Sequence, residues 1–122
     1  MPKSVNNLFV LPAALIIIFL TVSFSFSQLV NDFKVNDDST NTSQDHASLG
    51  VDGNGNFVVV WYDWRNSNEE IFCQLFNSLG QKTGSNFRLV SPGYSPDVAV
   101  RKDGSFGLCW LDTFPKFRLF NK

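Results

Sequence analysis

The chain repeats one stretch of sequence at a fixed distance. The first copy runs from Val51 to Asp63 (VDGNGNFVVVWYD) and the second from Val100 to Asp112 (VRKDGSFGLCWLD). An offset of 49 residues aligns the leading valines, and it also aligns a glycine, a phenylalanine, the tryptophan and the final aspartate of each copy. Self-similarity at such a period indicates an architecture built from one repeated supersecondary unit, which cannot bury its apolar face alone.

The sequences flanking the two copies are also related. Asn31–Val35 (NDFKV) precedes the first copy and Ser85–Leu89 (SNFRL) precedes the second, with an interval that is five residues shorter. A period of this length is typical of one propeller blade or one solenoid unit. The chain therefore holds one complete unit and most of a second.

From Gln28 onward the sequence is typical of an all-β protein. Its apolar residues form short runs rich in Val, Phe and Trp, which Gly, Asn, Asp and Pro interrupt. Asp52–Asn56 (DGNGN) has the residues that a tight hairpin turn favours. We predict eight short strands, at Asp32–Val35, His46–Val51, Asn56–Tyr62, Glu70–Phe76, Asn86–Leu89, Asp97–Val100, Ser105–Leu111 and Phe117–Phe120.

The strand around the first tryptophan is apolar on both faces. Alternate side chains of a strand point to opposite sides, and in Phe57–Tyr62 every side chain on either side is apolar or aromatic. Such a strand needs cover above and below, as packed sheets or neighbouring blades provide.

Residues 1–27 differ from the rest and are predicted to be a hydrophobic signal helix. Lys3 precedes the apolar run Leu8–Val22, and the small residues Ser25 and Ser27 occupy the positions that a signal peptidase reads. We therefore expect an exported chain of residues 28–122, located outside the cell, at the cell surface or in the periplasm.

An uncleaved membrane anchor is the alternative to a cleaved signal. Leu8–Phe26 carries no charge and approaches the length needed to cross a bilayer. Pro12 and the absence of a following Lys/Arg cluster favour cleavage.

Charge and cysteine content exclude two classes of function. With 10 basic against 11 acidic side chains the chain lacks the basic surface of a nucleic-acid-binding protein. Cys73 and Cys109 lack the paired spacing of a zinc site. They form either a disulfide, which an exported protein permits, or two buried free thiols, and we favour the thiols.

Several motifs together resemble the repeat of secreted bacterial β-propeller proteins. They are Phe33–Asn36 (FKVN), then Gly50–Asp63, then Ile71–Gly80 (IFCQLFNSLG), then Gly84–Arg88 (GSNFR). The resemblance implies four-stranded antiparallel blades around a central channel in an exported or cell-surface protein. It implies no single activity, because propellers host binding, scaffolding and hydrolysis alike.

The second copy departs from this pattern. No arginine follows Asp112, and Arg118–Asn121 repeats the motif of Gln74–Asn77 with five residues missing between. Closed propellers have about 4 to 8 blades. The resemblance therefore implies an incomplete propeller, either an amino-terminal fragment of a longer protein or a degenerate reading frame.

Two groups of residues are candidates for ligand binding. Asp52, Asn54 and Asn56 have the alternating oxygen ligands of a calcium loop, but the remaining loop positions do not match, so we favour a structural hairpin turn.

Asp63, Trp64 and Arg65 are candidate ligand-facing residues for a groove that binds carbohydrate or peptide. Their alternative role, which we favour, is to pack the sheet and fix its turn.

The sequence offers no catalytic residue and no cofactor. We expect a non-enzymatic binding or scaffold module for a protein or glycan ligand. The alternative is a fragment of a sialidase-like propeller that hydrolyses glycans, although the Asp-box order of such enzymes is absent.

Overall fold

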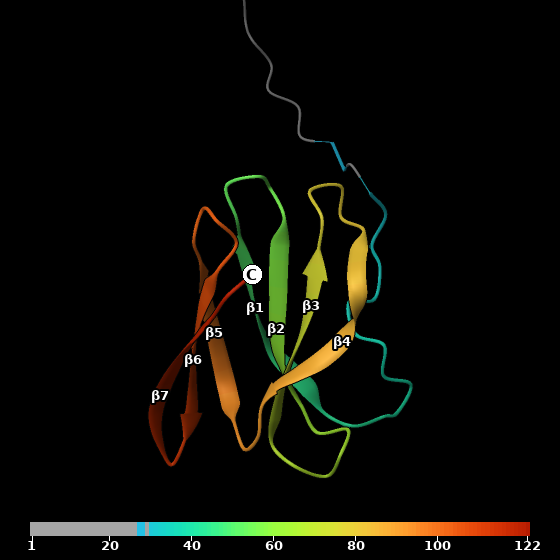
Figure 1. Cartoon of the computed structure of the whole chain (residues 1–122). Coiled ribbons are helices and arrows are strands. Elements are labelled where there is room, and N and C mark those ends of the chain that lie inside the picture. Colours follow the sequence, from blue (N-terminus) through green and yellow to red (C-terminus); the bar gives the residue numbers. More distant parts are fainter. Residues whose placement is uncertain (1–26, 29) are drawn as a thin grey trace, which may run out of the picture.

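The computed structural model describes residues 27, 28 and 30–122, which form two antiparallel β-sheets (Figure 1). Sheet 1 has four strands in sequential order: β1 (Gln44–Val51), β2 (Phe57–Asp63), β3 (Glu70–Phe76) and β4 (Lys82–Val90). Sheet 2 has three: β5 (Tyr94–Val100), β6 (Phe106–Asp112) and β7 (Phe114–Phe120). The predicted all-β class with antiparallel sheets is confirmed.

The predicted signal helix falls on residues that the structure does not describe, apart from Ser27. Within the described residues, no helix is long and apolar enough to cross a membrane.

Seven of the eight predicted strands are present. The prediction of a strand at Asp32–Val35 was wrong. Within the described residues this segment forms no backbone ladder with a neighbouring strand and instead lies over one face of sheet 1, where Val35 packs on β2 and β3. Asn86 of β4 fastens it there: its Oδ1 accepts from the Asp37 backbone N–H at 2.6 Å and its Nδ2 donates to the Val35 carbonyl at 3.4 Å. An alternating segment becomes a strand only where its backbone pairs with the edge of another strand.

The sequence repeat reappears in the backbone of the two hairpin turns. In the first, the Asp52 N–H donates to the Asn56 carbonyl at 2.8 Å, and in the second the Arg101 N–H donates to the Ser105 carbonyl at 2.8 Å. Gly55 and Gly104 both adopt the left-handed conformation, with φ of 81° and 89°. The turn chemistry predicted at Asp52–Asn56 is thus confirmed, and it occurs twice.

The two sheets pack against each other through one face of each. The shared core contains Val58, Val60, Ile71 and Cys73 from sheet 1, Val98, Phe106, Leu108 and Trp110 from sheet 2, and Leu89 and Val90 from the end of β4. The other face of sheet 1 holds a second cluster around Trp61 and Phe72, which Val35 covers in part. Strand β2 is therefore buried on both sides, as its sequence predicts.

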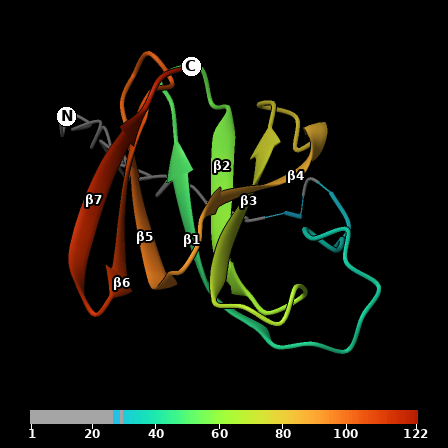
Figure 2. The same ribbon diagram turned by 60° about the horizontal axis from the view of Figure 1, so that its bottom comes forward.

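Strands β1 and β5 run side by side where the two sheets meet (Figure 2). Ser48 Oγ donates to Asp97 Oδ1 at 2.7 Å, and the Gly53 N–H donates to the Lys102 carbonyl at 3.1 Å. Gly50 faces Val100 so closely that a Cβ at this position would overlap with the valine side chain. The absence of a side chain at Gly50 therefore permits the close approach of the two strands.

The two cysteines are free thiols with different surroundings. Cys73 is fully buried in the shared core, as expected, whereas Cys109 is exposed, which corrects the expectation of two buried thiols. Cys109 lies opposite Phe117 on the face of sheet 2 that no other part of the described chain covers.

Candidate functional site: two versions of a tryptophan–aspartate motif

The first copy of the motif is a closed network around a buried carboxylate. Asp63 has no exposed surface. Its Oδ2 accepts from Trp61 Nε1 at 2.8 Å and from Arg65 Nη2 at 2.7 Å, and its Oδ1 accepts from the Arg65 backbone N–H at 2.9 Å. A buried carboxylate needs such donors, because an unpaired charge is costly away from water.

Arg65 is held on three sides. Its Nη1 donates to Asp37 Oδ1 at 2.7 Å, and its guanidinium carbon lies 4.1 Å from the centre of the Phe72 ring. Burial favours the neutral guanidine, but the hydrogen bonds to Asp63 and Asp37 outweigh it and raise the pKa of Arg65. Burial also acts against ionisation of Asp37, and its hydrogen bond with Arg65 nevertheless lowers the pKa of that carboxyl group.

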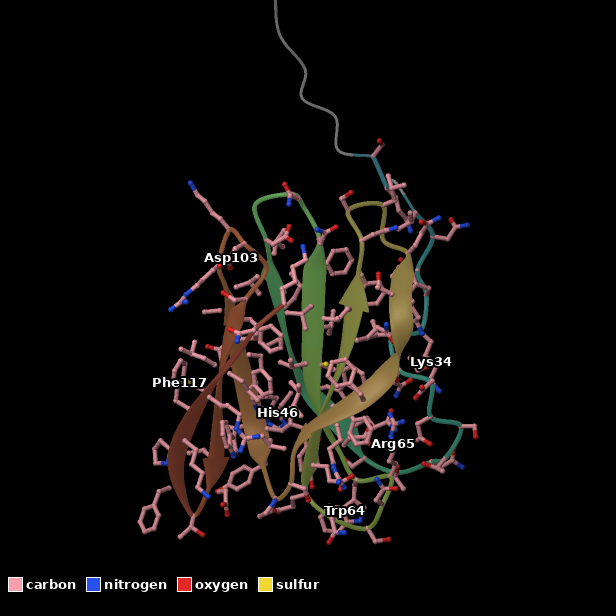
Figure 3. All side chains as sticks on the ribbon, in the orientation of Figure 1. Lys34, His46, Trp64, Arg65, Asp103 and Phe117 are labelled. Atoms are coloured by element: carbon pink, nitrogen blue, oxygen red, sulfur yellow. The ribbon has the colours of Figure 1, made fainter. Side chains whose placement is uncertain are left out.

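The three residues predicted to face a ligand therefore lie close together, but they are not equally accessible. Asp63 is buried, the Arg65 side chain is 15% exposed, and Trp64 is 38% exposed at the tip of the turn (Figure 3). The contacts of Asp63 and Arg65 are those of residues that fix the turn after β2.

The second copy of the motif lacks the residues that complete this network. Only Thr113, with φ of 52°, separates the paired residues Asp112 and Phe114, so no counterpart of Arg65 exists. The Asp112 carboxylate pairs with Lys116 Nζ instead. The Trp110 indole N–H is buried and has no hydrogen-bond partner among the described residues.

Strand register shows which residue of sheet 2 corresponds to Phe72, the ring on which Arg65 lies in the first copy. Phe72 lies opposite Trp61 in sheet 1, and Lys116 lies opposite Trp110 in sheet 2. The second copy thus has a lysine in place of an aromatic ring and has no turn arginine.

A hollow of about 380 Å³ is present at this position of the second copy. It lies between the end of β4, the link to β5, and strands β6 and β7, and its lining consists of Arg88, Leu89, Val90, Ser91, Pro92, Trp110, Asp112, Lys116 and Arg118. The sequence analysis missed this site. The two signals for it were the five residues missing after Asp112 and the basic residues at positions 116 and 118.

The calcium candidates lie in the first hairpin turn, where the turn itself uses the oxygens of Asp52. Its Oδ1 accepts from the backbone N–H groups of Asn54 at 2.8 Å and Asn56 at 2.9 Å, and its Oδ2 accepts from Asn56 Nδ2 at 2.8 Å. The hydrogen bond from the Asn56 side chain is the main reason that the pKa of Asp52 is lowered. Within the described residues, no group of three or more His, Cys, Asp or Glu side chains could hold a metal ion.

Comparison of this chain with protein-family models, with curated proteins and with solved structures finds no match.

Proposed function

We propose that this chain is an exported, non-enzymatic binding or scaffold module of the β-propeller type, in which sheets 1 and 2 are successive units of a head-to-tail stack. The proposal rests on one observation. The exposed face of sheet 2 consists of the same strand positions as the face of sheet 1 that sheet 2 covers. The proposed ligand is a further sheet of the same kind.

The outer face of sheet 2 is the side of β6 and β7 that points away from sheet 1. It consists of Cys109, Leu111, Pro115, Phe117 and Leu119. Strand register places these residues at the positions that Val60, Tyr62, Ile71, Cys73 and Leu75 occupy in sheet 1. In sheet 1 that face is covered by sheet 2, and most of its members belong to the shared core.

Exposure of the outer face supports docking. Phe117 and Leu119 are 60% and 53% exposed, and Figure 3 shows Phe117 on the side of β7 away from sheet 1. Within the part of the chain that the structure describes, β7 is also an unpaired edge strand, whereas its counterpart β3 is paired with β4. An apolar face beside an open strand edge is a surface that proteins usually cover.

The opposite end of the stack has a complementary surface. Val98 and Val100 of β5 face the shared core, and their counterparts in β1 are Leu49 and Val51, which are 55% and 52% exposed. A contact between the outer face of one copy and the β1 side of another would repeat the contact between the two sheets within the chain. Such a contact is heterologous, and it forms rings or open stacks rather than closed dimers.

The surroundings of the repeated aspartates favour binding over hydrolysis. Glycoside hydrolysis generally uses two carboxyl groups about 5 to 10 Å apart, one of them free to exchange a proton. Asp63 is instead held by Arg65 and Trp61, in a role that fixes the turn.

Export is the part of the proposal that rests on residues 1–27. Mass spectrometry of the secreted product tests it: the mature chain should begin at or near Gln28. A product that keeps Met1 and stays in the membrane would contradict cleavage.

Self-association tests the docking surface. Analytical ultracentrifugation of the chain over a range of concentrations should show reversible growth beyond a dimer. Phe117→Lys should weaken this association, because it places a charge in the proposed contact. Leu79→Lys is the matched control, since Leu79 is 71% exposed in the turn between β3 and β4 and lies outside the outer face. A wild-type chain that remains monomeric throughout, or equal effects of the two substitutions, would refute the stacking proposal.

A further inference from the structure

We propose that the hollow beside Trp110 binds an organic monoanion through its carboxylate group. Nothing in the proposed stacking function requires this site, and it is argued from different residues. It has three features that a carboxylate site needs: an unused buried donor, an exposed guanidinium and an excess of positive charge.

The unused donor is the Trp110 indole N–H. Trp110 is 6% exposed, and its Nε1 has no partner among the described residues. Its counterpart Trp61 donates to Asp63 at 2.8 Å, so the same motif normally satisfies this group. Buried polar groups in folded proteins almost always have a partner, so the exception indicates that an acceptor outside the chain fills this place.

Arg118 supplies the guanidinium. Its guanidinium carbon lies 5.4 Å from the centre of the Trp110 ring, and Nη1 makes one long hydrogen bond, of 3.4 Å, to the Leu89 carbonyl. An arginine carries five N–H donors in a planar fork that matches a carboxylate. Most of these donors remain free to hold a ligand beside the Trp110 ring.

The charge balance favours a single negative charge on the ligand. Three cations line the hollow: Arg88, Lys116 and Arg118. Two of them already have partners, since Arg88 pairs with the buried Glu70 at 2.7 Å and Lys116 pairs with Asp112. One positive charge, that of Arg118, is left over, which matches a carboxylate better than a divalent sulfate or phosphate.

The size and the origin of the hollow support a small ligand. Its accessible lining is mostly polar, since Leu89 and Val90 are only 9% and 6% exposed, and its volume of about 380 Å³ lies within the range of small-molecule sites. In the first copy, Arg65 lies over Phe72 and bonds to Asp63 in the corresponding place. The shorter turn of the second copy leaves that space open.

The indole N–H signals of the three tryptophans give a direct test. The full chain, labelled with ¹⁵N and kept in solution with a non-ionic detergent, is titrated with glucuronate, with glucose and with sulfate at matched ionic strength. We expect glucuronate to move the Trp110 indole signal saturably while the Trp61 and Trp64 signals stay in place. Glucose should move none of them, and sulfate should act more weakly than glucuronate.

Two substitutions locate the effect. Arg118→Gln introduces the residue that sheet 1 has at the same register position, Gln74, and should weaken glucuronate binding at least tenfold. Lys82→Gln removes an exposed positive charge at the start of β4 and should leave the binding unchanged. The proposal is overturned if glucuronate produces no saturable shift, if glucose or sulfate acts as strongly, or if the two variants respond alike.

Discussion

His46 and Ser95 are 49 residues apart and share an uncommon backbone conformation, with φ of 52° and 50°. Each lies in the first strand of its sheet, at a shift in the pairing register with the next strand, between Asp45 and Ser48 in β1 and between Tyr94 and Asp97 in β5. Positive φ is unusual for residues other than glycine, and a bulge increases the local twist of its strand. Its occurrence at the same position in both copies makes the bulge a property of the repeated unit.

The network around Asp63 should contribute strongly to stability. Replacing Asp63 with alanine leaves Arg65 and the Trp61 indole N–H without their main acceptor in a buried place. Loss of one partner of a buried ion pair costs about 3 to 5 kcal/mol. We expect urea unfolding of Asp63→Ala to show a decrease of that order in the free energy of unfolding.

Asp112→Ala is the matched control, because Asp112 is the same residue of the second copy and, among the described residues, its side chain bonds only to the exposed Lys116. Its loss should cost less than about 1 kcal/mol, as for surface ion pairs. Equal losses at the two positions would contradict a closed network in the first copy.

The contact between β1 and β5 depends on the missing side chain of Gly50. Gly50→Ala would place a methyl group against Val100, and overpacking of this kind costs about 1 to 3 kcal/mol. The double variant with Val100→Ala makes room for the new methyl group. We therefore expect it to be more stable than the sum of the two single effects, as measured by a double-mutant cycle in urea. Simple additivity would show that the two strands do not meet as described.

The fold was predictable from the sequence to the extent that local rules determine it. Period-two alternation and turn residues define strands and hairpins within a few positions, so seven strands and the turn at Asp52–Asn56 could be predicted. Asp32–Val35 has the same alternation, but Val35 packs on the face of sheet 1 and the segment does not pair with a strand edge. Propensity alone cannot supply that information.

The candidate site was less predictable because it depends on the covering layers. Cys109 aligns with the buried Val60, yet it is exposed because the described chain places no third sheet over it. The unpaired Trp110 N–H follows from the short turn at Thr113, which changes which groups reach the indole. A repeat predicts position within a unit, whereas burial and pairing depend on the neighbours of that unit.

The first hairpin turn should make stability depend on pH. Hydrogen bonds from Asn56 and Asn54 lower the pKa of Asp52 below its ordinary value of 3.8. A carboxyl group whose pKa is lower in the folded state stabilises the protein above its unfolded pKa, and this contribution is lost as the pH falls through the folded pKa.

Urea unfolding of the wild-type chain and of Asp52→Asn at pH 7 and pH 3 checks this sign. The wild-type chain should be the more stable of the two at pH 7, and the difference should shrink at pH 3, where the asparagine variant has no carboxyl group to protonate. The same comparison with Asp103→Asn tests the second turn, where Ser105 lowers the pKa of Asp103. A difference that is independent of pH would mean that the turn does not stabilise the ionised carboxylate.

The two thiols should differ in reactivity. Cys73 is fully buried, and burial raises its pKa to about 12, so it carries almost no reactive thiolate near neutral pH. Cys109 is exposed on the outer face of sheet 2. Iodoacetamide at pH 8 should therefore alkylate Cys109 alone, as peptide mass spectrometry can show, and both cysteines in concentrated urea. If the outer face docks a second copy, alkylation of Cys109 should also slow as the protein concentration rises, and Phe117→Lys should remove that dependence. Rapid labelling of Cys73 in the folded chain would contradict its burial between the sheets.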